Sequence, residues 1–198
     1  MRKRIIVIIL IVAVAIGLAF GIDGIMKLSE KKTHPREFED IVSRYSKEYG
    51  IPEYILYAVI KTESDFDPSA ESSAGARGLM QMMPETFLWL TGSDHLNENL
   101  PAEALYDPEV SIKYGAYYLR YLYRKFDYNW DNVFAAYNAG EGNVAKWLED
   151  SEYSDGEGNL TEIPFKETKN YVSKVNNEMD TYKKLYYKEQ NEVMSNEE

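Results

Sequence analysis

Apolar residues recur three and four positions apart along most of this chain, which is the spacing of one face of an α-helix. This pattern predicts helices over residues 36–49, 52–63, 129–137 and 144–148, and others that begin near residues 107 and 167. No segment alternates apolar and polar residues clearly enough to make strands the main element. Because 198 residues with 44% apolar side chains can bury one core of ordinary size, we expect one globular, mostly α-helical domain.

The N-terminus carries a separate signal. Arg2, Lys3 and Arg4 precede an uncharged apolar run of 18 residues, 5–22, which spans roughly 27 Å as a helix and so approaches the thickness of a bilayer core. We expect residues 1–22 to be a cytoplasmic basic stub and a single transmembrane anchor, with everything after it outside the cytoplasm. The alternative is a cleaved signal peptide, whose apolar region is usually shorter, at about 7–15 residues.

The remaining sequence divides by composition. Residues 23–35 are polar and short and are interpreted as a linker, residues 36–188 as the folded domain, and residues 189–198 as a charged tail. A net charge of −11 makes nucleic acid an unfavourable partner, because phosphate binding needs clustered Lys and Arg. The chain has no cysteine and two distant histidines, so we expect no structural zinc site.

One carboxylate interrupts the apolar pattern. Leu56, Val59 and Ile60 lie on one helical face, and the next residue on that face is Glu63, in the last turn. The negative end of the helix dipole and burial both disfavour a charged carboxylate, so the pKa of Glu63 should be raised. A carboxylic acid that stays protonated near neutral pH suits general-acid cleavage of a glycosidic bond. The alternative is a structural glutamate paired with Lys61 or Arg77.

Four blocks of sequence bear on this choice. They are Glu63-Ser64, S-x-x-G-x-x-G-L-M-Q-M-M-P from Ser72 to Pro84, A-Y-N-A-G from Ala136 to Gly140, and E-I-P-F-x-E-T-x-x-Y-V from Glu162 to Val172. In this order they resemble the lytic transglycosylase family of the SLT type, which is related to goose-type lysozyme. The resemblance covers roughly residues 36–182 and implies a lysozyme-like domain.

The resemblance also implies residue roles. Glu63 would be the sole catalytic acid and base, and Asp65, about 200° further round the helix, should point away from it. The substrate-binding residues implied are Ser64, Ser72, Gln81, Met83, Tyr137, Asn138 and Glu162. Taken alone, Ser64 fits a turn cap and Glu162 a surface acid. Gly78 is interpreted as leaving room for a sugar, and the other methionines and the tyrosines between residues 114 and 123 mainly as core.

The function implied is cleavage of the β-1,4 bond between N-acetylmuramic acid and N-acetylglucosamine in peptidoglycan, with formation of a 1,6-anhydro ring and without a cofactor. The enzyme would be membrane-anchored and act outside the cytoplasm on glycan strands. Two alternatives remain open. One is a lysozyme-type hydrolase that uses the same Glu63 with water, and the other is a non-catalytic wall-binding component of an envelope complex.

Overall fold

A computed structural model describes residues 17–18, 21, 24 and 28–187. The chain divides into two units, residues 1–35 with 188–198, and residues 36–187. In the first unit, residues 28–33 are helical. The predicted anchor lies almost wholly outside the described residues, as does the predicted charged tail. In the part of the chain that is described, no helix is both long and apolar enough to cross a bilayer.

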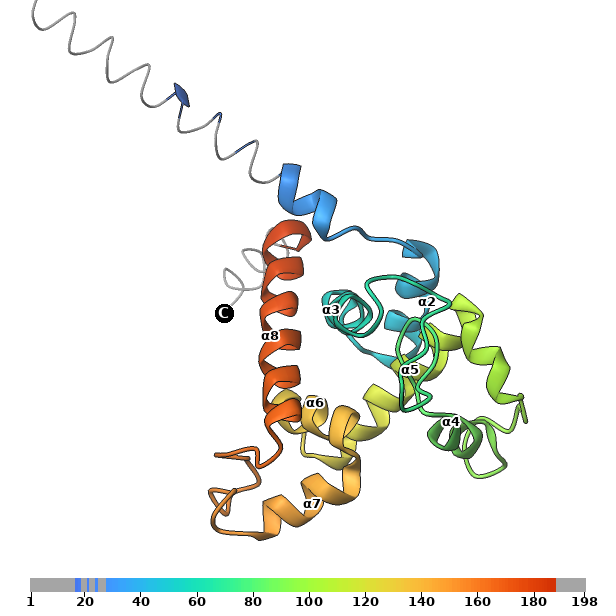
Figure 1. Ribbon diagram of the computed structural model, residues 1–198, viewed down its shortest axis with the longest axis vertical. Helices are drawn as coiled ribbons and strands as arrows, with labels where there is room; N and C mark the ends of the chain where they lie inside the picture. The colour runs from blue at the N-terminus through green and yellow to red at the C-terminus, as the bar shows by residue number, and fades with distance from the viewer. Residues whose placement is uncertain (1–16, 19–20, 22–23, 25–27, 188–198) are drawn as a thin grey trace, which may run out of the picture. The chain divides into compact units, whose positions relative to one another are not determined.

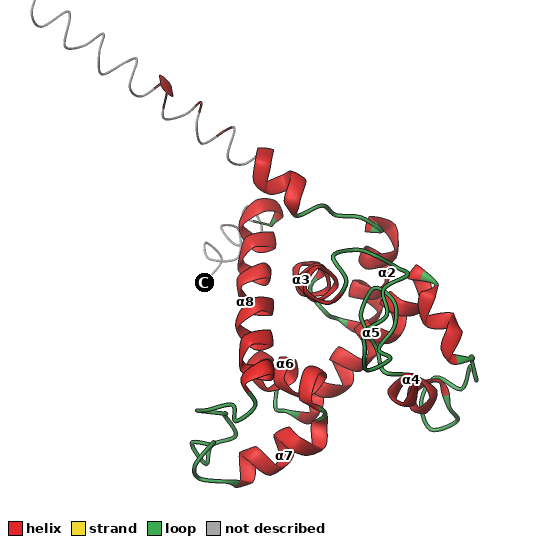
Figure 2. Cartoon of the chain, viewed as in Figure 1, coloured by secondary structure: helices red, strands yellow, loops and turns green. Residues whose placement is uncertain are grey.

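The second unit is mostly helical, as the apolar spacing predicted. The described residues contain isolated β-bridges and no strand, and Figure 2 shows helices joined by loops. In chain order (Figure 1) the elements are α2 (Glu39–Tyr49), α3 (Glu53–Glu63), α4 (Pro84–Thr91), the 3-10 helix η1 (Ala102–Tyr106), α5 (Pro108–Lys125), α6 (Trp130–Ala139), α7 (Glu141–Glu149) and α8 (Lys166–Tyr186).

Local sequence signals fix several of these helix ends. Gly50 ends α2 in the left-handed conformation, with a φ of 65°, which glycine adopts at little cost. Pro52 precedes the first turn of α3. The Asp107 side chain accepts hydrogen bonds from the backbone N–H groups of Glu109 and Val110 at the start of α5, where Pro108 is the first helical residue.

The core is built around α3. Six consecutive residues of this helix, Ile55 to Ile60, are buried, which is the pattern of a helix covered on all sides. Helix α3 packs on α8 and α2, α5 packs on α2 and α6, and α6 packs on α8. In Figure 1, α3 is seen nearly end-on between α8 and α2. Glu63, the last residue of α3, lies at the contact of α3 with α8.

The segment between α3 and α5 contains two elements that the periodicity did not predict, α4 and η1. In this segment the structure also changes the interpretation of Gly78. This glycine is buried with a φ of +74°, and a β-carbon there would lie 1.9 Å from the backbone oxygen of Leu105 in η1. Gly78 therefore makes room for the protein's own backbone rather than for a sugar.

Candidate active site

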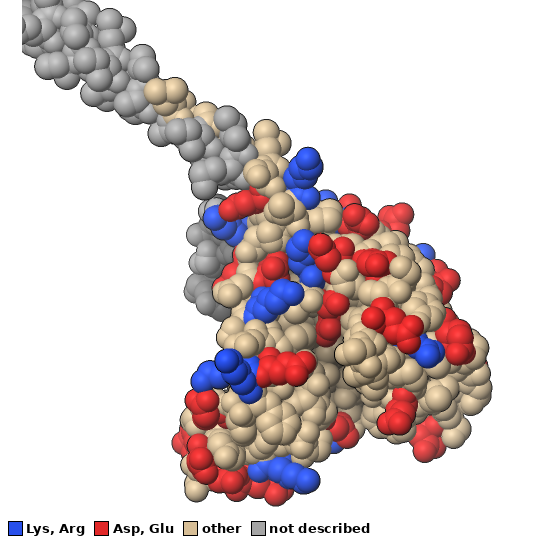
Figure 3. Space-filling view, in the orientation of Figure 1, with Lys and Arg blue, Asp and Glu red and all other residues tan. Residues whose placement is uncertain are grey.

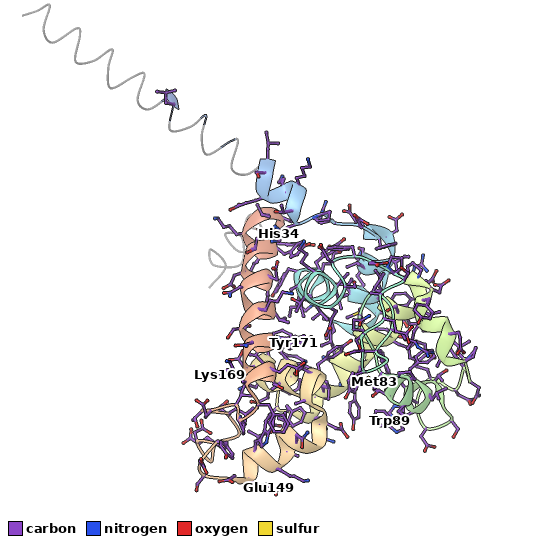
Figure 4. All side chains as sticks on the ribbon, viewed as in Figure 1. His34, Met83, Trp89, Glu149, Lys169 and Tyr171 are labelled. Atoms are coloured by element: carbon purple, nitrogen blue, oxygen red, sulfur yellow. The ribbon has the colours of Figure 1, made fainter. Side chains whose placement is uncertain are left out.

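Glu63 meets its hydrogen-bond partner across the contact of α3 with α8. The hydroxyl of Tyr171 donates a hydrogen bond of 2.6 Å to Oε1 of Glu63. Tyr171 is buried, and Figure 4 marks it on the side of α8 that faces the other helices. A hydrogen bond this short to a carboxyl group holds the side chain in one orientation. The Glu63 carboxyl is thus fixed between α3 and α8 by a partner that lies 108 residues away in the sequence.

Burial raises the pKa of Glu63 from an ordinary 4.5 to about 7. The Tyr171 hydrogen bond and the positive charge of Lys174 act in the opposite direction and lower it. Lys174 lies on α8, and its Nζ donates a hydrogen bond of 3.1 Å to the backbone oxygen of Thr62, the residue before Glu63 in α3. The pKa of Tyr171 lies well above 10, because burial and the nearby Glu63 carboxylate both disfavour a phenolate, so Tyr171 remains a hydrogen-bond donor.

The structural pairing of Glu63 with Lys61 or Arg77 is wrong. Lys61 forms its ion pair with Asp65, while Arg77 lies between Glu71 and Glu103, at 3.7 and 3.5 Å. Within residues 28–187 no ion pair involves Glu63. The Asp65 side chain is 75% exposed and faces Lys61, in agreement with the prediction that it points away from Glu63.

Four of the predicted substrate-binding residues line one cavity of about 250 Å³. They are Gln81 and Met83 from the loop before α4, and Tyr137 and Asn138 from the end of α6. The other lining residues are Met82, Thr86, Tyr118, Ala139 and Gly140. Met83 is 39% exposed, while Met82 is buried. The cavity thus combines polar groups with apolar side chains, as sugar-binding sites require.

Electrostatics connect this cavity to Glu63. The pKa of Tyr137 is raised well above 10, first by burial and then by the charge of Glu63. The Tyr137 hydroxyl donates a hydrogen bond of 2.8 Å to the backbone oxygen of Met80. Asn138 is fixed in turn, because the hydroxyl of buried Thr168 donates a 2.7 Å hydrogen bond to its Oδ1. Within residues 28–187 the Nδ2 group of Asn138 donates no hydrogen bond, so it is available to a ligand.

Hydrogen bonds from side chains to backbone oxygens hold the loop that forms the other wall of the cavity. The Ser64 hydroxyl contacts the carbonyl oxygens of Ile60 and Leu79, at 3.2 and 2.8 Å, and so fastens the end of α3 to this loop. Gln81 has a left-handed φ of 44° and donates through Nε2 to the carbonyl oxygens of Ala70 and Gly78, both at 2.9 Å. These bonds orient the Gln81 amide with both its donors used, so its oxygen is the group available to a ligand.

Ser72 and Glu162 lie outside the lining of this cavity. Ser72 is exposed, and its hydroxyl accepts a hydrogen bond of 3.0 Å from the backbone N–H of Ala76 within a tight turn. Glu162 is exposed and forms an ion pair of 2.8 Å with Lys169 on α8. The binding roles implied for these two residues stay predictions.

The sequence interpretation missed Tyr171, Thr168 and Lys174 as parts of the site. Tyr171 and Thr168 both lie in the block from Glu162 to Val172, and Tyr171 also lies on the apolar face of α8. Both are buried polar residues, so each needs a hydrogen-bond partner, and this was the available signal. Across the described residues, no group of three His, Asp or Glu side chains is placed to hold a metal ion.

Comparison with known proteins decides the family. The model of the transglycosylase SLT domain matches residues 40–159, which is more than half of the chain. The chain belongs to the transglycosylase SLT domain family. The soluble lytic murein transglycosylase of Escherichia coli K12 is 37% identical over 142 residues, which are 71% of this chain. The membrane-bound lytic murein transglycosylase C of Edwardsiella ictaluri is 31% identical over 185 residues, covering 79% of this chain and 48% of that protein.

The fold agrees with this family. The crystal structure of the 70 kDa soluble lytic transglycosylase of Escherichia coli matches 80% of this SLT-family chain with a TM-score of 0.72 and 33% sequence identity. The match covers only 26% of that structure, and the chain spans 22% of the Escherichia coli K12 sequence. The shared part is therefore the helical, lysozyme-like domain, and the predicted mostly α-helical, lysozyme-like fold is confirmed.

Proposed function

We propose that this SLT-family protein is a lytic transglycosylase that cleaves the β-1,4 bond between N-acetylmuramic acid and N-acetylglucosamine in peptidoglycan. The observation that carries this proposal is the Glu63 carboxyl, with a pKa near 7, beside a cavity lined by Gln81, Tyr137 and Asn138. Relatives with the same domain are named lytic murein transglycosylases, both soluble and membrane-bound.

In the proposed reaction, protonated Glu63 gives its proton to the glycosidic oxygen as the bond to the muramoyl C1 breaks. The N-acetylglucosamine part leaves with a new hydroxyl group. Glu63, now a carboxylate stabilised by Tyr171 and Lys174, takes the proton from the muramoyl C6 hydroxyl, and O6 bonds to C1. No water is consumed, and Glu63 ends protonated. Intramolecular attack has an effective molarity of about 10⁵ M or more when the groups are well oriented, which favours it over capture of water.

A retaining hydrolase would place a second carboxyl group about 5 Å from the acid. Asp65, the nearest acid in sequence, is exposed and paired with Lys61, and no acid lines the cavity. Both observations favour the C6 hydroxyl over an enzyme nucleophile.

The remaining predicted residues are assigned to substrate binding. We propose that Met83 contacts a sugar ring and that Ser64 holds the loop that contacts substrate. We also propose that Ser72 and Glu162 bind substrate at the edge of the groove.

Product analysis tests the reaction. Digestion of purified peptidoglycan should release fragments that end in 1,6-anhydro-N-acetylmuramic acid, which are lighter by one water than hydrolytic fragments and do not react with borohydride. Mass spectrometry before and after reduction distinguishes them. Reducing ends would identify a lysozyme-type hydrolase instead. No fragments at all from folded protein would favour the non-catalytic wall-binding alternative.

Substitution of Glu63 tests the residue that carries the reaction. Glu63→Gln keeps the shape of the side chain but has no acidic proton to donate, so activity on peptidoglycan should fall at least ~100-fold. Asp65→Asn, which changes an exposed carboxylate two residues away, should leave activity within about twofold, because exposed ion pairs contribute little. A Glu63→Gln variant with near-normal turnover would remove Glu63 from the mechanism.

We further propose that residues 1–22 anchor the protein in the cytoplasmic membrane with the SLT domain outside. The support is the basic stub followed by 18 uncharged apolar residues, and a relative named as membrane-bound. Protease added to cells whose wall has been removed should then digest the domain while the protein stays in the membrane fraction. Mature protein free in the medium, with a new N-terminus beyond residue 22, would show that this segment is a cleaved signal peptide.

A further inference from the structure

One face of α5 carries a group of cations that do not line the active-site cavity. A cavity of about 440 Å³ is lined by Tyr117, Arg120, Tyr121, Arg124 and Lys125. Their spacing of three, one, three and one puts all five on the same side of the helix. Of the tyrosines predicted as core in this helix, Tyr117 and Tyr121 are only partly buried, so their rings form part of the surface.

A second cavity, of about 310 Å³, adjoins the first. It shares Tyr117, Arg120 and Arg124 and is completed by the end of α2, where Lys47, Glu48, Tyr49 and Gly50 line it. We call the surface formed by Lys47, Arg120, Arg124, Lys125, Tyr117 and Tyr121 the basic face. It holds four cations with one lining acid, in a chain whose net charge is −11. Figure 3 shows Asp and Glu side chains spread over the face of the molecule in view.

Most of the positive charge on the basic face is not neutralised by the protein. Lys125 forms an ion pair of 2.9 Å with Glu141. Within residues 28–187, Lys47, Arg120 and Arg124 take part in no ion pair. Cations in the last turn of a helix interact favourably with the helix dipole. This accounts for Lys47 in α2 and for Arg124 and Lys125 in α5. It does not account for Arg120, which lies before the last turn of α5. The dipole also gives no reason for two adjoining cavities with tyrosine walls.

The basic face begins beside the candidate active site. Tyr118, which lines the active-site cavity, stacks on Tyr121 with ring centres 6.2 Å apart and planes at 11°. Tyr118 also contacts the ring of Tyr137, with ring centres 5.5 Å apart. Tyr118 and Arg124 are six residues apart, about 9 Å along the helix axis. A polymer bound at the active-site cavity can therefore extend a branch onto the basic face.

We propose that the basic face binds the carboxylate groups of the peptides that branch from the muramoyl residues of the glycan strand. This inference rests on the proposed function, since it assigns a second part of the same substrate. Guanidinium groups bind carboxylates through paired hydrogen bonds, and Arg120 and Arg124 are the two unpaired guanidinium groups of this face. The rings of Tyr117 and Tyr121 supply apolar surface for the peptide chain. The basic face thus selects strands that still carry their peptides.

The test measures binding separately from cleavage. The full chain in mild detergent, carrying Glu63→Gln so that the polymer stays intact, is sedimented with walls freed of phosphate polymers. One wall preparation keeps its peptides, and the other is stripped of them by an amidase. We expect about tenfold tighter binding to the peptide-bearing walls, the size expected for a few partly exposed charged contacts. Adding Arg120→Gln and Arg124→Gln should reduce this preference to less than about twofold.

The control removes the same charge elsewhere. Lys146 and Lys184 are exposed, lie on α7 and α8 and take part in no ion pair within the described residues. Lys146→Gln with Lys184→Gln should retain the tenfold preference. If the double arginine variant does not fold, the single Arg124→Glu at an exposed position replaces it, and it should abolish the preference.

Three results would overturn the proposal: no preference in the parent protein, equal loss in the lysine control, or arginine-dependent binding that appears only on walls that keep their phosphate polymers. The last result is read on a third preparation, walls that keep their phosphate polymers, and would identify phosphate as the ligand. Product analysis of the unsubstituted chain separates this failure from that of the proposed function. Anhydro products without a peptide preference overturn the basic face alone, whereas folded protein that yields no products overturns the proposed function.

Discussion

Replacing Glu63 with glutamine should make the folded protein more stable relative to the parent at alkaline pH than at acidic pH, although it abolishes the proposed activity. Burial raises the pKa of the Glu63 carboxyl from 4.5 to about 7, so the fold disfavours its charged form. The protonated carboxyl therefore contributes to the free energy of unfolding. This contribution is fully present below pH 4.5 and is lost as the pH rises through 7. Glutamine is neutral at every pH and does not incur this loss.

The size of the effect follows from the pKa. A pKa difference of one corresponds to about 1.4 kcal/mol, so a change from 4.5 to about 7 corresponds to about 3 kcal/mol by pH 8.5. Roughly 1.4 kcal/mol of this is already lost at pH 5.5, which leaves about 2 kcal/mol between pH 5.5 and pH 8.5. Because Glu63 is only partly buried, solvent screening reduces the expected difference to about 1–2 kcal/mol.

Urea unfolding followed by tryptophan fluorescence measures this difference. The free energy of unfolding of Glu63→Gln minus that of the parent should increase by about 1–2 kcal/mol from pH 5.5 to pH 8.5, since all other titrating groups cancel in the comparison. Asp65→Asn is the matched control, because its carboxylate is 75% exposed, and its difference should stay within about 0.5 kcal/mol. A flat profile for Glu63→Gln would refute the argument that burial governs this carboxyl.

Three further substitutions test other contacts of the site. Tyr171→Phe removes a hydrogen bond that lowers the pKa of Glu63, so the decline of activity above pH 7 should move to higher pH; an unshifted pH–rate profile would contradict this. Thr168→Val frees the cavity asparagine to rotate, so KM should rise about 3–10-fold while the pH profile stays unchanged, and an unchanged KM would contradict the role. Gly78→Ala should lower the free energy of unfolding by more than about 3 kcal/mol. The control Gly156→Ala has a similar φ of +75° and no atom within 4 Å of the added β-carbon, so it should lower it by about 1 kcal/mol. Equal melting temperatures of the two variants would refute the backbone clash at Gly78.

The helices could be predicted where local sequence decides them. The Asp107 cap with Pro108 and the terminating Gly50 act through their own backbone, so their signals are readable without tertiary information. Helix α4 and the 3-10 helix η1 could not be predicted in this way. Helix α4 has eight residues and η1 has five, and lengths of this order are marginal without tertiary packing.

The candidate site shows the same division. Glu63 could be singled out because it interrupts an apolar face, and its position in the last turn of α3 is local information. Its partner Tyr171 lies 108 residues away, and its spacing on α8 looks like that of a core residue. Gly78 was misinterpreted for the same reason, because the atom that requires a glycine there belongs to Leu105, which only the fold brings near.

The contacts of Glu63 also bear on how one carboxyl group could serve both halves of the proposed reaction. With a pKa of 4.5, roughly 0.3% of the enzyme would hold the required proton at pH 7, whereas a pKa of about 7 keeps about half of it protonated. Burial alone would favour the acid and leave the carboxylate, which must act next as the base, without stabilisation. Tyr171 and Lys174 supply that stabilisation without a formal ion pair. The pKa near 7 is therefore the balance of opposing contributions, and Tyr171 and Lys174, both on α8, supply the ones that oppose burial.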